Sequence, residues 1–444
     1  MERGRDLPKD LRIAALEWSM GGVSVCSNIN EPRNVSRFGL QNIRKKYEGN
    51  CEYIGSEVMK HTFDLLNMKG ERADVIFITT VDEASDRSYL HNNVLPDYLK
   101  PQGYTLLKRA KLDIGEKQAG GHNMMDRKGY LRVSTYVHLD VADTFKQGEA
   151  IITRAAKKTH LRNGVDNQFK VFCDVSNSRQ GAIGTYIFSS IYGSICAISF
   201  HFPIGGTIEG SEGQKKNARQ TQLRQKEICM NSFLNHFVRV PNNTRGFSVE
   251  NVVIMGNMNS LIVDSEKNVV PRASIMDLIS RGGYSELANK DELSNMIHGY
   301  PFEEDIFEYS EGVNGVPTFP PSSLLKSRDT CSYNGIRDTS PSSSMKTECY
   351  NDNAIPMYTD RILYGTRKSG HVGRGYTMHC EGYDLFYDPK ISIGGHAAVF
   401  SNLILTKDAA PRLTKRGNVN MDKMEDKVPL NRDDTKTGMD EKEV

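Results

Sequence analysis

The feature that most constrains the fold of this chain is a series of short apolar runs, each ending in turn or polar residues. Runs of this kind are typical of β-strands. We predict strands in "LRIAALEWSMGG", "ADVIFITTV", "YLRVSTYVHLDV", "VFCDVSN", "GAIGTYIFSSIYGSICAISFHF", "VVIMGNMNSLI", "RILYGT" and "AAVFSNLILT". Helical patterns are few, and they do not alternate regularly with the strands. This arrangement predicts an α+β sandwich.

Two stretches predict helices, "GSEVMKHTFDLLNMKG" and "QTQLRQKEICMNSFLNHFV". The apolar side chains of the second should form one buried stripe. Its members are Leu223, Ile228, Phe233, Leu234 and Phe237.

Composition excludes several classes of protein. The net charge is only +2, so the chain has no bulk attraction for nucleic acid or anionic lipid, and we do not expect nucleic acid as a partner. No run is long and apolar enough to span a membrane, and "MERGRDLPKD" lacks the apolar core of a signal peptide. The eight cysteines are scattered without a CxxC pair, which predicts reduced thiols in the cytoplasm.

The chain divides into three predicted regions. Residues 1–10 are a charged extension, and residues 11–406 form one large domain. Within this domain, residues 320–353 are rich in Ser, Thr and Asn, which predicts a long surface loop. Residues 407–444 carry many charges and no aromatic residue, which predicts a flexible tail.

Two asparagines end the apolar run "VVIMGNMNSLI". Polar residues at the end of a buried strand often border an active site. The amides of Asn257 and Asn259 can bind a ligand, but an amide does not take a proton from water. Both residues are equally explained as turn formers after Gly256, because asparagine tolerates left-handed backbone.

Six short motifs occur in a particular order: "EWSMGG", "VDEAS", "ISFHFPIGG", "MGNMNSLI", "IPMYTDRILYG" and "SIGGHAAVF". Together they resemble the motifs of the inositol polyphosphate 5-phosphatase catalytic domain. This family belongs to the endonuclease/exonuclease/phosphatase superfamily, which has the deoxyribonuclease I-like fold. The resemblance spans about residues 11–405. It implies two stacked, mostly antiparallel β-sheets flanked by helices in a four-layer sandwich.

The resemblance also implies a chemistry. In the family, water attacks a phosphate ester in line, a carboxylate activates the water, and Mg²⁺ and histidines stabilise the phosphoryl charge. Glu83 matches the metal-ligand glutamate, and Asn259 matches the asparagine that orients phosphate and water. His201 and His396 match the two histidines.

Asp360 and Arg361 match the Asp-Arg pair of the motif T-D-R-I-L. The resemblance implies a site role for Asp360, and it makes Arg361 a phosphate-binding residue together with Asn259 and His201. The alternative is structural, because Asp360 and Arg361 could form a buried ion pair that fixes their strand.

Three departures remove charged groups from the motifs. Ser19 replaces an asparagine near the metal, Asn257 replaces the aspartate expected to act as the base, and Gly395 replaces the aspartate before His396. The family's substrate lysines are also missing, with Gln180 at one of the positions. Loss of a general base typically lowers the rate by about 10²- to 10⁴-fold.

These departures favour a catalytically inactive protein that uses the fold as a structural or binding component of a larger assembly, such as a viral particle. Its partners would be other protein subunits, without a cofactor, in the cytoplasm or a virion. It could also bind phosphate or an inositol phosphate without cleaving it. One alternative is a Mg²⁺-dependent phosphomonoesterase acting on inositol phosphates or phosphoinositides. The other is a phosphodiesterase or nuclease of the same superfamily.

Overall fold

The structure of the chain is a computed structural model. It describes residues 9–20, 72–83, 88–114, 129–147, 170–172, 181–202, 212–239, 249–297, 307–326, 331, 333–334, 345–352, 354–368, 375–387 and 395–407. The predicted helix near residues 55–70 and Gln180 lie outside these ranges. So does nearly all of the predicted extension and tail, and the division into three regions stays a prediction.

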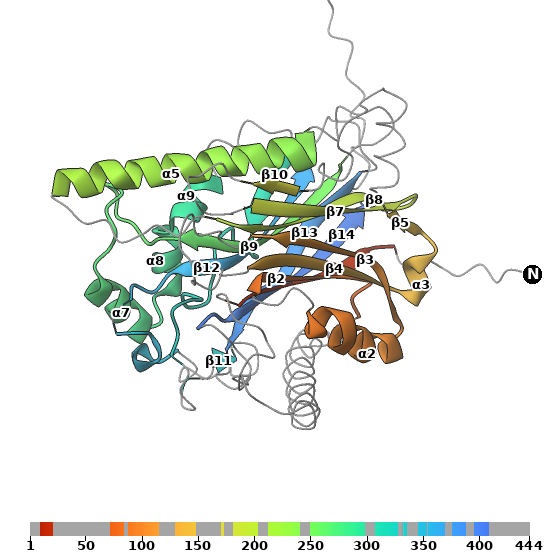
Figure 1. Cartoon of the computed structure of the whole chain (residues 1–444), viewed down its shortest axis with the longest axis horizontal. Coiled ribbons are helices and arrows are strands. Elements are labelled where there is room, and N and C mark those ends of the chain that lie inside the picture. Colours follow the sequence, from red (N-terminus) through yellow and green to blue (C-terminus); the bar gives the residue numbers. More distant parts are fainter. Residues whose placement is uncertain are drawn as a thin grey trace, which may run out of the picture. The chain divides into compact units, whose positions relative to one another are not determined.

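The described strands form two sheets (Figure 1). The first has the order β11-β13-β14-β1-β2-β4-β3. The second has the order β10-β12-β9-β8-β7-β5, with β6 beside β7. The strands are β1 Leu11–Ser19, β2 Val75–Glu83, β3 Tyr104–Asp113, β4 Tyr130–His138, β5 Phe145–Gln147, β6 Lys170–Phe172, β7 Gly181–Ser189, β8 Gly193–His201, β9 Asn251–Ser260, β10 Phe307–Glu311, β11 Tyr333–Asn334, β12 Tyr358–Arg367, β13 Tyr376–Tyr387 and β14 Ala398–Lys407.

Helices cover the outer faces of the sheets (Figure 1). The α-helices are α2 Leu95–Leu99, α3 Leu139–Ala142, α5 Glu212–Leu234, α7 Arg272–Ser280, α8 Tyr284–Asn289 and α9 Glu292–Ile297. The π- and 3-10 helices are η2 Leu90–Val94, η3 Lys100–Gln102, η5 Asn235–Arg239 and η6 Thr347–Cys349. No helix in the described ranges is long and apolar enough to cross a membrane.

Strand alternation separates the hydrophobic layers. Ile13 of β1 and Val253 of β9 belong to the core between the sheets. The next residue of β1, Ala14, packs outward with α2, whereas Val252 of β9 packs outward with Phe233 of α5. The predicted fold class, two mostly antiparallel sheets with flanking helices, is confirmed. Among the described strands, the parallel pairs are β1 with β2 and β8 with β9.

Three local predictions need correction. Ile228 of α5 is 58% exposed, and the buried stripe instead contains Lys226 and Met230. The segment 320–353 is not a surface loop at its described ends, because Ser322 and Tyr350 are both fully buried. The strands β3, β5, β10, β11 and β13 were not predicted.

Candidate functional site

The site lies where three neighbouring strands of the second sheet end. His201 of β8 and Asp360 of β12 are the register partners of Asn257 on β9, one on each side. Directly paired residues share a face of a sheet. Met255, two residues before Asn257, belongs to the core between the sheets. The side chains of His201, Asn257 and Asp360 therefore lie on this inner face.

The first sheet reaches the same place through the end of β1. The Nδ2 atom of Asn257 donates to the Oγ atom of Ser19 at 3.1 Å, and the backbone N–H of Asn259 donates to Oδ1 of Asn257 at 3.2 Å. Ser19 is fully buried, and Asn257 is 4% exposed. Both ends of the Asn257 amide are thus held by protein groups, one from each sheet.

Backbone geometry explains part of the "MGNMN" motif. Gly256 has φ +149°, and a Cβ atom there would lie 2.1 Å from the carbonyl oxygen of Phe200, so only glycine fits. Asn259 has φ +44°, which agrees with its interpretation as a turn former. Its side chain also holds the turn, because Nδ2 donates to the carbonyl of Phe202 at 3.0 Å.

A buried lysine supports this turn from outside the sheet. The Nζ atom of Lys226, on α5, donates to the carbonyl of Asn259 at 2.7 Å and to the carboxylate of Glu292 at 2.8 Å. Lys226 was not predicted, because a lysine on the buried face of α5 departs from the apolar pattern that indicates such a face. Glu292 also lines a cleft of about 450 Å³, whose charged residues are Glu227, Asp264, Lys267 and Glu292. Because three of these four residues are acidic, the cleft would repel a ligand with several negative charges.

His396 and Asp360 form a hydrogen-bonded pair. The Nδ1 atom of His396 lies 2.9 Å from Oδ2 of Asp360 and 3.2 Å from Oδ1. Ser322 holds Asp360 in place, since its hydroxyl donates to Oδ2 at 2.9 Å and accepts the backbone N–H of Asp360 at 3.0 Å. The carbonyl of Ser322 accepts from the backbone N–H of Ala397 at 2.9 Å. One serine thus joins β12, which carries Asp360, to the residues just before β14, where His396 lies.

Gly395 has a conformation of its own, with φ +76°. Its carbonyl accepts from the backbone N–H of Leu325 at 2.9 Å. A Cβ atom at this position would lie 2.9 Å from the carbonyl oxygen of Leu325. The missing aspartate before His396 is therefore accompanied by a backbone arrangement that disfavours any side chain.

His201 is held neutral. Burial, and then the nearby His396, lower the pKa of His201 to about 4. Its Nδ1 atom is buried and has no hydrogen-bond partner among the residues that the structure describes. At neutral pH, His201 can donate one N–H to a ligand but brings no positive charge.

Arg361 does not belong to the site. It is fully buried, and its guanidinium donates to Glu311 at 2.5 Å, to Asp291 at 2.6 Å and to Ser294 at 3.3 Å. Because adjacent strand residues point to opposite faces, Arg361 points away from the face that carries Asp360. The predicted phosphate contact is therefore wrong. An ion pair between Arg361 and Asp360 does not form either, since the partners of Arg361 are Glu311 and Asp291.

The predicted metal ligands are only partly described. Glu83 ends β2, but its side chain lies outside the described part, as does that of Asp82. Ser19 contributes a neutral, hydrogen-bonded hydroxyl. Within the described ranges, no three or more His, Cys, Asp or Glu side chains are grouped as a metal site would need. Mg²⁺, however, is usually held by one or two carboxylates and several waters.

One carboxyl group close to the site was missed by sequence analysis. Glu17 precedes Ser19 by two residues on β1, is fully buried, and neither of its carboxyl oxygens has a hydrogen-bond partner among the described residues. Burial, followed by the nearby Asp360, raises the pKa of Glu17 well above its ordinary range. The family motif that "EWSMGG" resembles has no carboxylate at this position. The one signal for Glu17 in the sequence was a charged residue within an otherwise apolar strand. An orphaned carboxyl is the kind of group that fits a hard cation.

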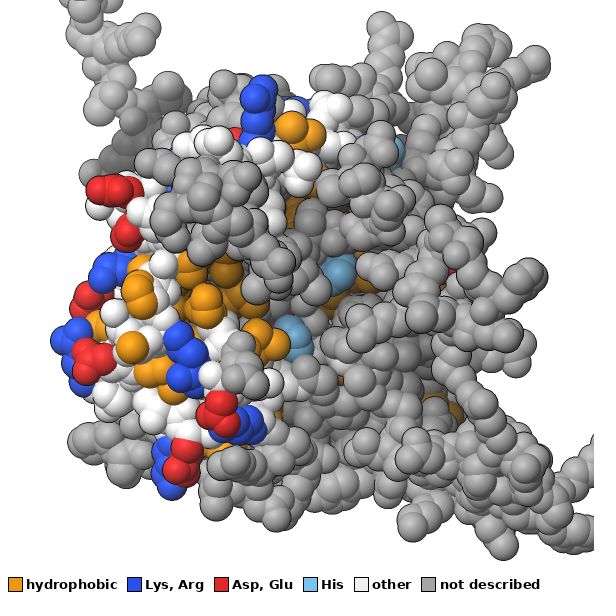
Figure 2. Space-filling model, turned by 60° about the vertical axis from the view of Figure 1, so that its left-hand side comes forward, with side chains coloured by type: hydrophobic (Ala, Val, Ile, Leu, Met, Phe, Trp, Pro, Cys, Tyr) orange, Lys and Arg blue, Asp and Glu red, His pale blue; other side chains and the backbone are white. Residues whose placement is uncertain are grey.

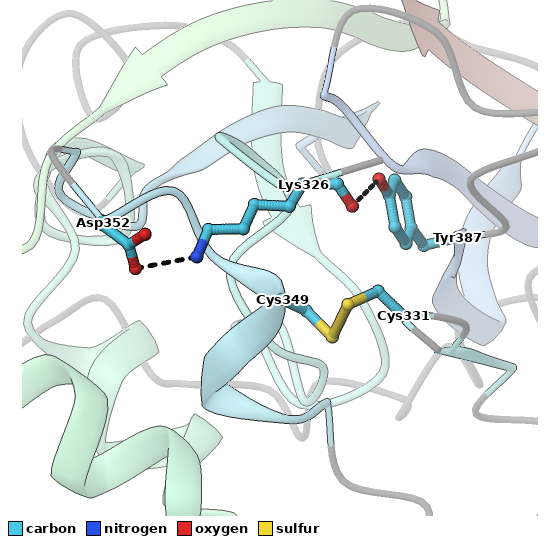
Figure 3. Close-up of a disulfide and its surroundings, with 5 residues drawn as sticks. All are labelled: Lys326, Cys331, Cys349, Asp352 and Tyr387. Atoms are coloured by element: carbon cyan, nitrogen blue, oxygen red, sulfur yellow. Dashed lines mark hydrogen bonds and ion pairs between the residues drawn. A yellow bond between two sulfur atoms is a disulfide. The ribbon is translucent and has the colours of Figure 1, made fainter. Parts of the chain in front are cut away.

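A disulfide cross-links the chain next to the segment from Ser322 to Lys326, which contacts Asp360 and Gly395 (Figure 3). Cys331 and Cys349 are joined, with 5.3 Å between their Cα atoms. The carbonyl of Cys349 accepts from the backbone N–H of Lys326 at 2.6 Å, and the Lys326 carbonyl accepts from the hydroxyl of Tyr387 at 2.9 Å. Cys229 is disulfide-bonded as well. The prediction of reduced thiols is wrong for these cysteines, because folding brings together residues that sequence spacing keeps apart.

Figure 2 shows histidine side chains at the surface of the molecule, next to hydrophobic ones. On the described part of this face, Lys and Arg side chains are intermingled with Asp and Glu side chains. No surface of single sign is visible there. This distribution gives a nucleic-acid backbone no continuous basic track on this face.

The protein is an α+β sandwich with a polar site at the ends of its strands. No protein-family model matches the chain, and no curated protein matches its sequence. Solved structures similar to it are those of endonuclease/exonuclease/phosphatase superfamily members. One, from Beutenbergia cavernae DSM 12333, has 10% identity and a TM-score of 0.38, and the match covers 90% of this chain and 72% of that one.

Another superfamily member, from Bacteroides vulgatus, has 10% identity and a TM-score of 0.30 over 89% of this chain and 99% of its own. Beta toxin from Staphylococcus aureus has 12% identity and a TM-score of 0.35, with 88% and 99% covered. At such low identities and scores, the likeness carries no argument about activity. The functional argument rests on the site itself.

Proposed function

We propose that this protein is a catalytically inactive relative of the inositol polyphosphate 5-phosphatases, and that it serves as a binding or structural component. The observation that carries this proposal is the state of Asn257. Its amide stands at the position expected for the general base and is hydrogen-bonded to Ser19 and Asn259. A neutral amide held on both sides does not accept a proton from water.

The loss of charge extends beyond the base. The arginine expected to contact phosphate is buried in another network, and His201 is neutral. Among the described residues that match the motifs, only His396 can add positive charge to the site. A phosphate ligand would therefore be held by hydrogen bonds and at most one imidazolium, which supports weak binding at best. Other protein subunits remain the proposed partners.

A second candidate function is a Mg²⁺-dependent phosphomonoesterase. One observation favours it, namely the intact pair of His396 and Asp360, held at 2.9 Å and supported by Ser322. A histidine oriented by a carboxylate is suited to stabilising a phosphoryl group or a proton in transfer. The candidate lacks a base, however, and only another group could supply that proton transfer.

The test is a phosphate-release assay with Mg²⁺ and soluble inositol polyphosphates. We expect no release from the wild type, and partial activity from Asn257→Asp, because aspartate can still accept from Asn259, can accept in turn from the Ser19 hydroxyl, and can take up a proton. Thermal unfolding with the same ligands measures binding without turnover. Wild-type release that His396→Ala abolishes would contradict inactivity and establish the second candidate.

A further inference from the structure

We propose that Glu17 supplies a carboxylate ligand to a divalent-cation site at the base of this constellation, with oxygen atoms of Ser19 and Asn257 beside it. The cation would be a hard one, such as Mg²⁺ or Mn²⁺. This inference does not depend on whether the protein hydrolyses a phosphate ester.

The placement of Glu17 supports the proposal. Glu17 and Ser19 are two residues apart on β1, so their side chains leave the strand on the same face. That face meets the second sheet, because the Ser19 hydroxyl accepts from the amide of Asn257. Ala15, the preceding residue on this face, belongs to the core between the sheets. Glu17 is thus the point where the apolar interior changes into the polar site.

Glu17 differs from the other buried carboxylates of the described ranges because its carboxyl oxygens have no hydrogen-bond partner there. The other buried carboxylates that the structure describes each have a partner: Glu311 and Asp291 bind Arg361, Glu292 binds Lys226, Asp360 binds His396, and Asp74 accepts from the backbone N–H of Arg12. Both oxygens of Glu17 lack a hydrogen-bond partner among the described residues. Burial of an unpaired carboxyl is costly, and the fold elsewhere avoids that cost.

Electrostatics identifies the charge that is missing. Asp360 is the charged neighbour that acts on Glu17, and its effect is repulsive. A divalent cation between the two acids would relieve this repulsion and give Glu17 a charged partner. The available atoms are carboxylate, hydroxyl and amide oxygens, the ligands that Mg²⁺ and Mn²⁺ prefer. One or two carboxylates suffice for Mg²⁺ when water completes its coordination.

The test uses the metal alone, without phosphate. Mn²⁺ is titrated into the full chain, and bound metal is counted from the loss of the free-ion electron paramagnetic resonance signal, while thermal unfolding is followed with Mn²⁺ and Mg²⁺. We expect one saturable site in the wild type, and at least about tenfold weaker binding in Glu17→Gln, since an amide replaces the charged ligand. Glu286→Gln, which changes an exposed carboxylate, should bind like the wild type.

Glu17→Gln removes an ionisable group that has no hydrogen-bond partner among the described residues, so we expect the metal-free variant to fold as well as the wild type. Its far-ultraviolet circular dichroism and unfolding temperature without metal verify this. Absence of saturable Mn²⁺ binding to the wild type would overturn the proposal. So would equal binding by the wild type and Glu17→Gln, even if Glu83→Gln then abolished it.

Discussion

At the scale of single residues, Gly395 occupies a backbone position that disfavours any side chain. An aspartate there must adopt φ +76° and place its Cβ atom 2.9 Å from the Leu325 carbonyl oxygen. Gly282 has a similar φ of +70° but nothing within 4 Å of such a Cβ atom. A side chain at Gly282 therefore carries only the cost of left-handed backbone, whereas a side chain at Gly395 also carries the cost of a steric clash.

We predict that Gly395→Asp destabilises the protein by about 1–3 kcal/mol more than Gly282→Asp does. Both variants carry the penalty of left-handed backbone, but only Gly395→Asp also displaces the segment at Leu325. Urea unfolding of the two variants measures the difference. Equal losses would show that the contact at Leu325 relaxes freely.

His201 gives a prediction about pH. Its folded pKa of about 4 lies below the usual value of 6.5, so the unfolded state binds more protons as the pH falls between these values. The stabilisation is present above pH 6.5 and is lost on acidification. Between pH 7 and pH 5 it should amount to about 2 kcal/mol. The measurement is the difference in this pH dependence between the wild type and His201→Asn, which should lack it. Parallel curves would contradict a neutral His201.

At the scale of structural elements, the buried guanidinium of Arg361 ties β12 to β10 through Glu311 and to the start of α9 through Asp291. Tyr383 of β13 adds a hydrogen bond to Glu311 at 2.7 Å. This network joins elements of both sheets. Its role is therefore structural, on the opposite side of β12 from the candidate site.

We predict that Arg361→Met costs about 3–5 kcal/mol, because it leaves two buried carboxylates without their partner. Arg281→Met, which changes an exposed ion pair on the surface, should cost no more than about 0.5 kcal/mol. Denaturant unfolding gives both values. A small loss for Arg361→Met would mean that Glu311 and Asp291 are protonated or solvated at little cost.

The disulfide acts on a different element, the segment from Ser322 to Lys326. The double variant Cys331→Ser, Cys349→Ser should lower stability by about 3 kcal/mol, the value typical of a loop of this size. Hydrogen exchange should also rise at Leu325 and Lys326, whose N–H groups bond to Gly395 and Cys349. The wild type in reductant should show the same rise in exchange at these two N–H groups, but it also loses the disulfide of Cys229, so only the exchange and not the total stability is compared. Unchanged exchange at both N–H groups would show that the segment is held without the disulfide.

At the scale of the whole molecule, apolar periodicity predicted the strands whose inner and outer faces are both covered. It failed for β3, "YTLLKRAKLD", because an edge strand with one exposed face tolerates charges. The order of motifs brought together Ser19, His201, Asn257, Asp360 and His396, as the structure shows. The alternation of side chains along a strand could by itself have predicted that Arg361 and Asp360 point to opposite faces of β12. Glu17 could not be found in this way, since no motif position marks it.

The position of β1 has a consequence for synthesis of the protein. β1 lies between β2 and β14, and it pairs with β14 from Leu11 opposite Leu405 to Glu17 opposite Val399. Because β1 is synthesised long before β14, its second neighbour is missing until the ribosome has added residues 20–407. Such long-range pairing makes folding slow and leaves an apolar strand edge open meanwhile. A nascent chain stalled before Ala398 should accordingly need a chaperone until release.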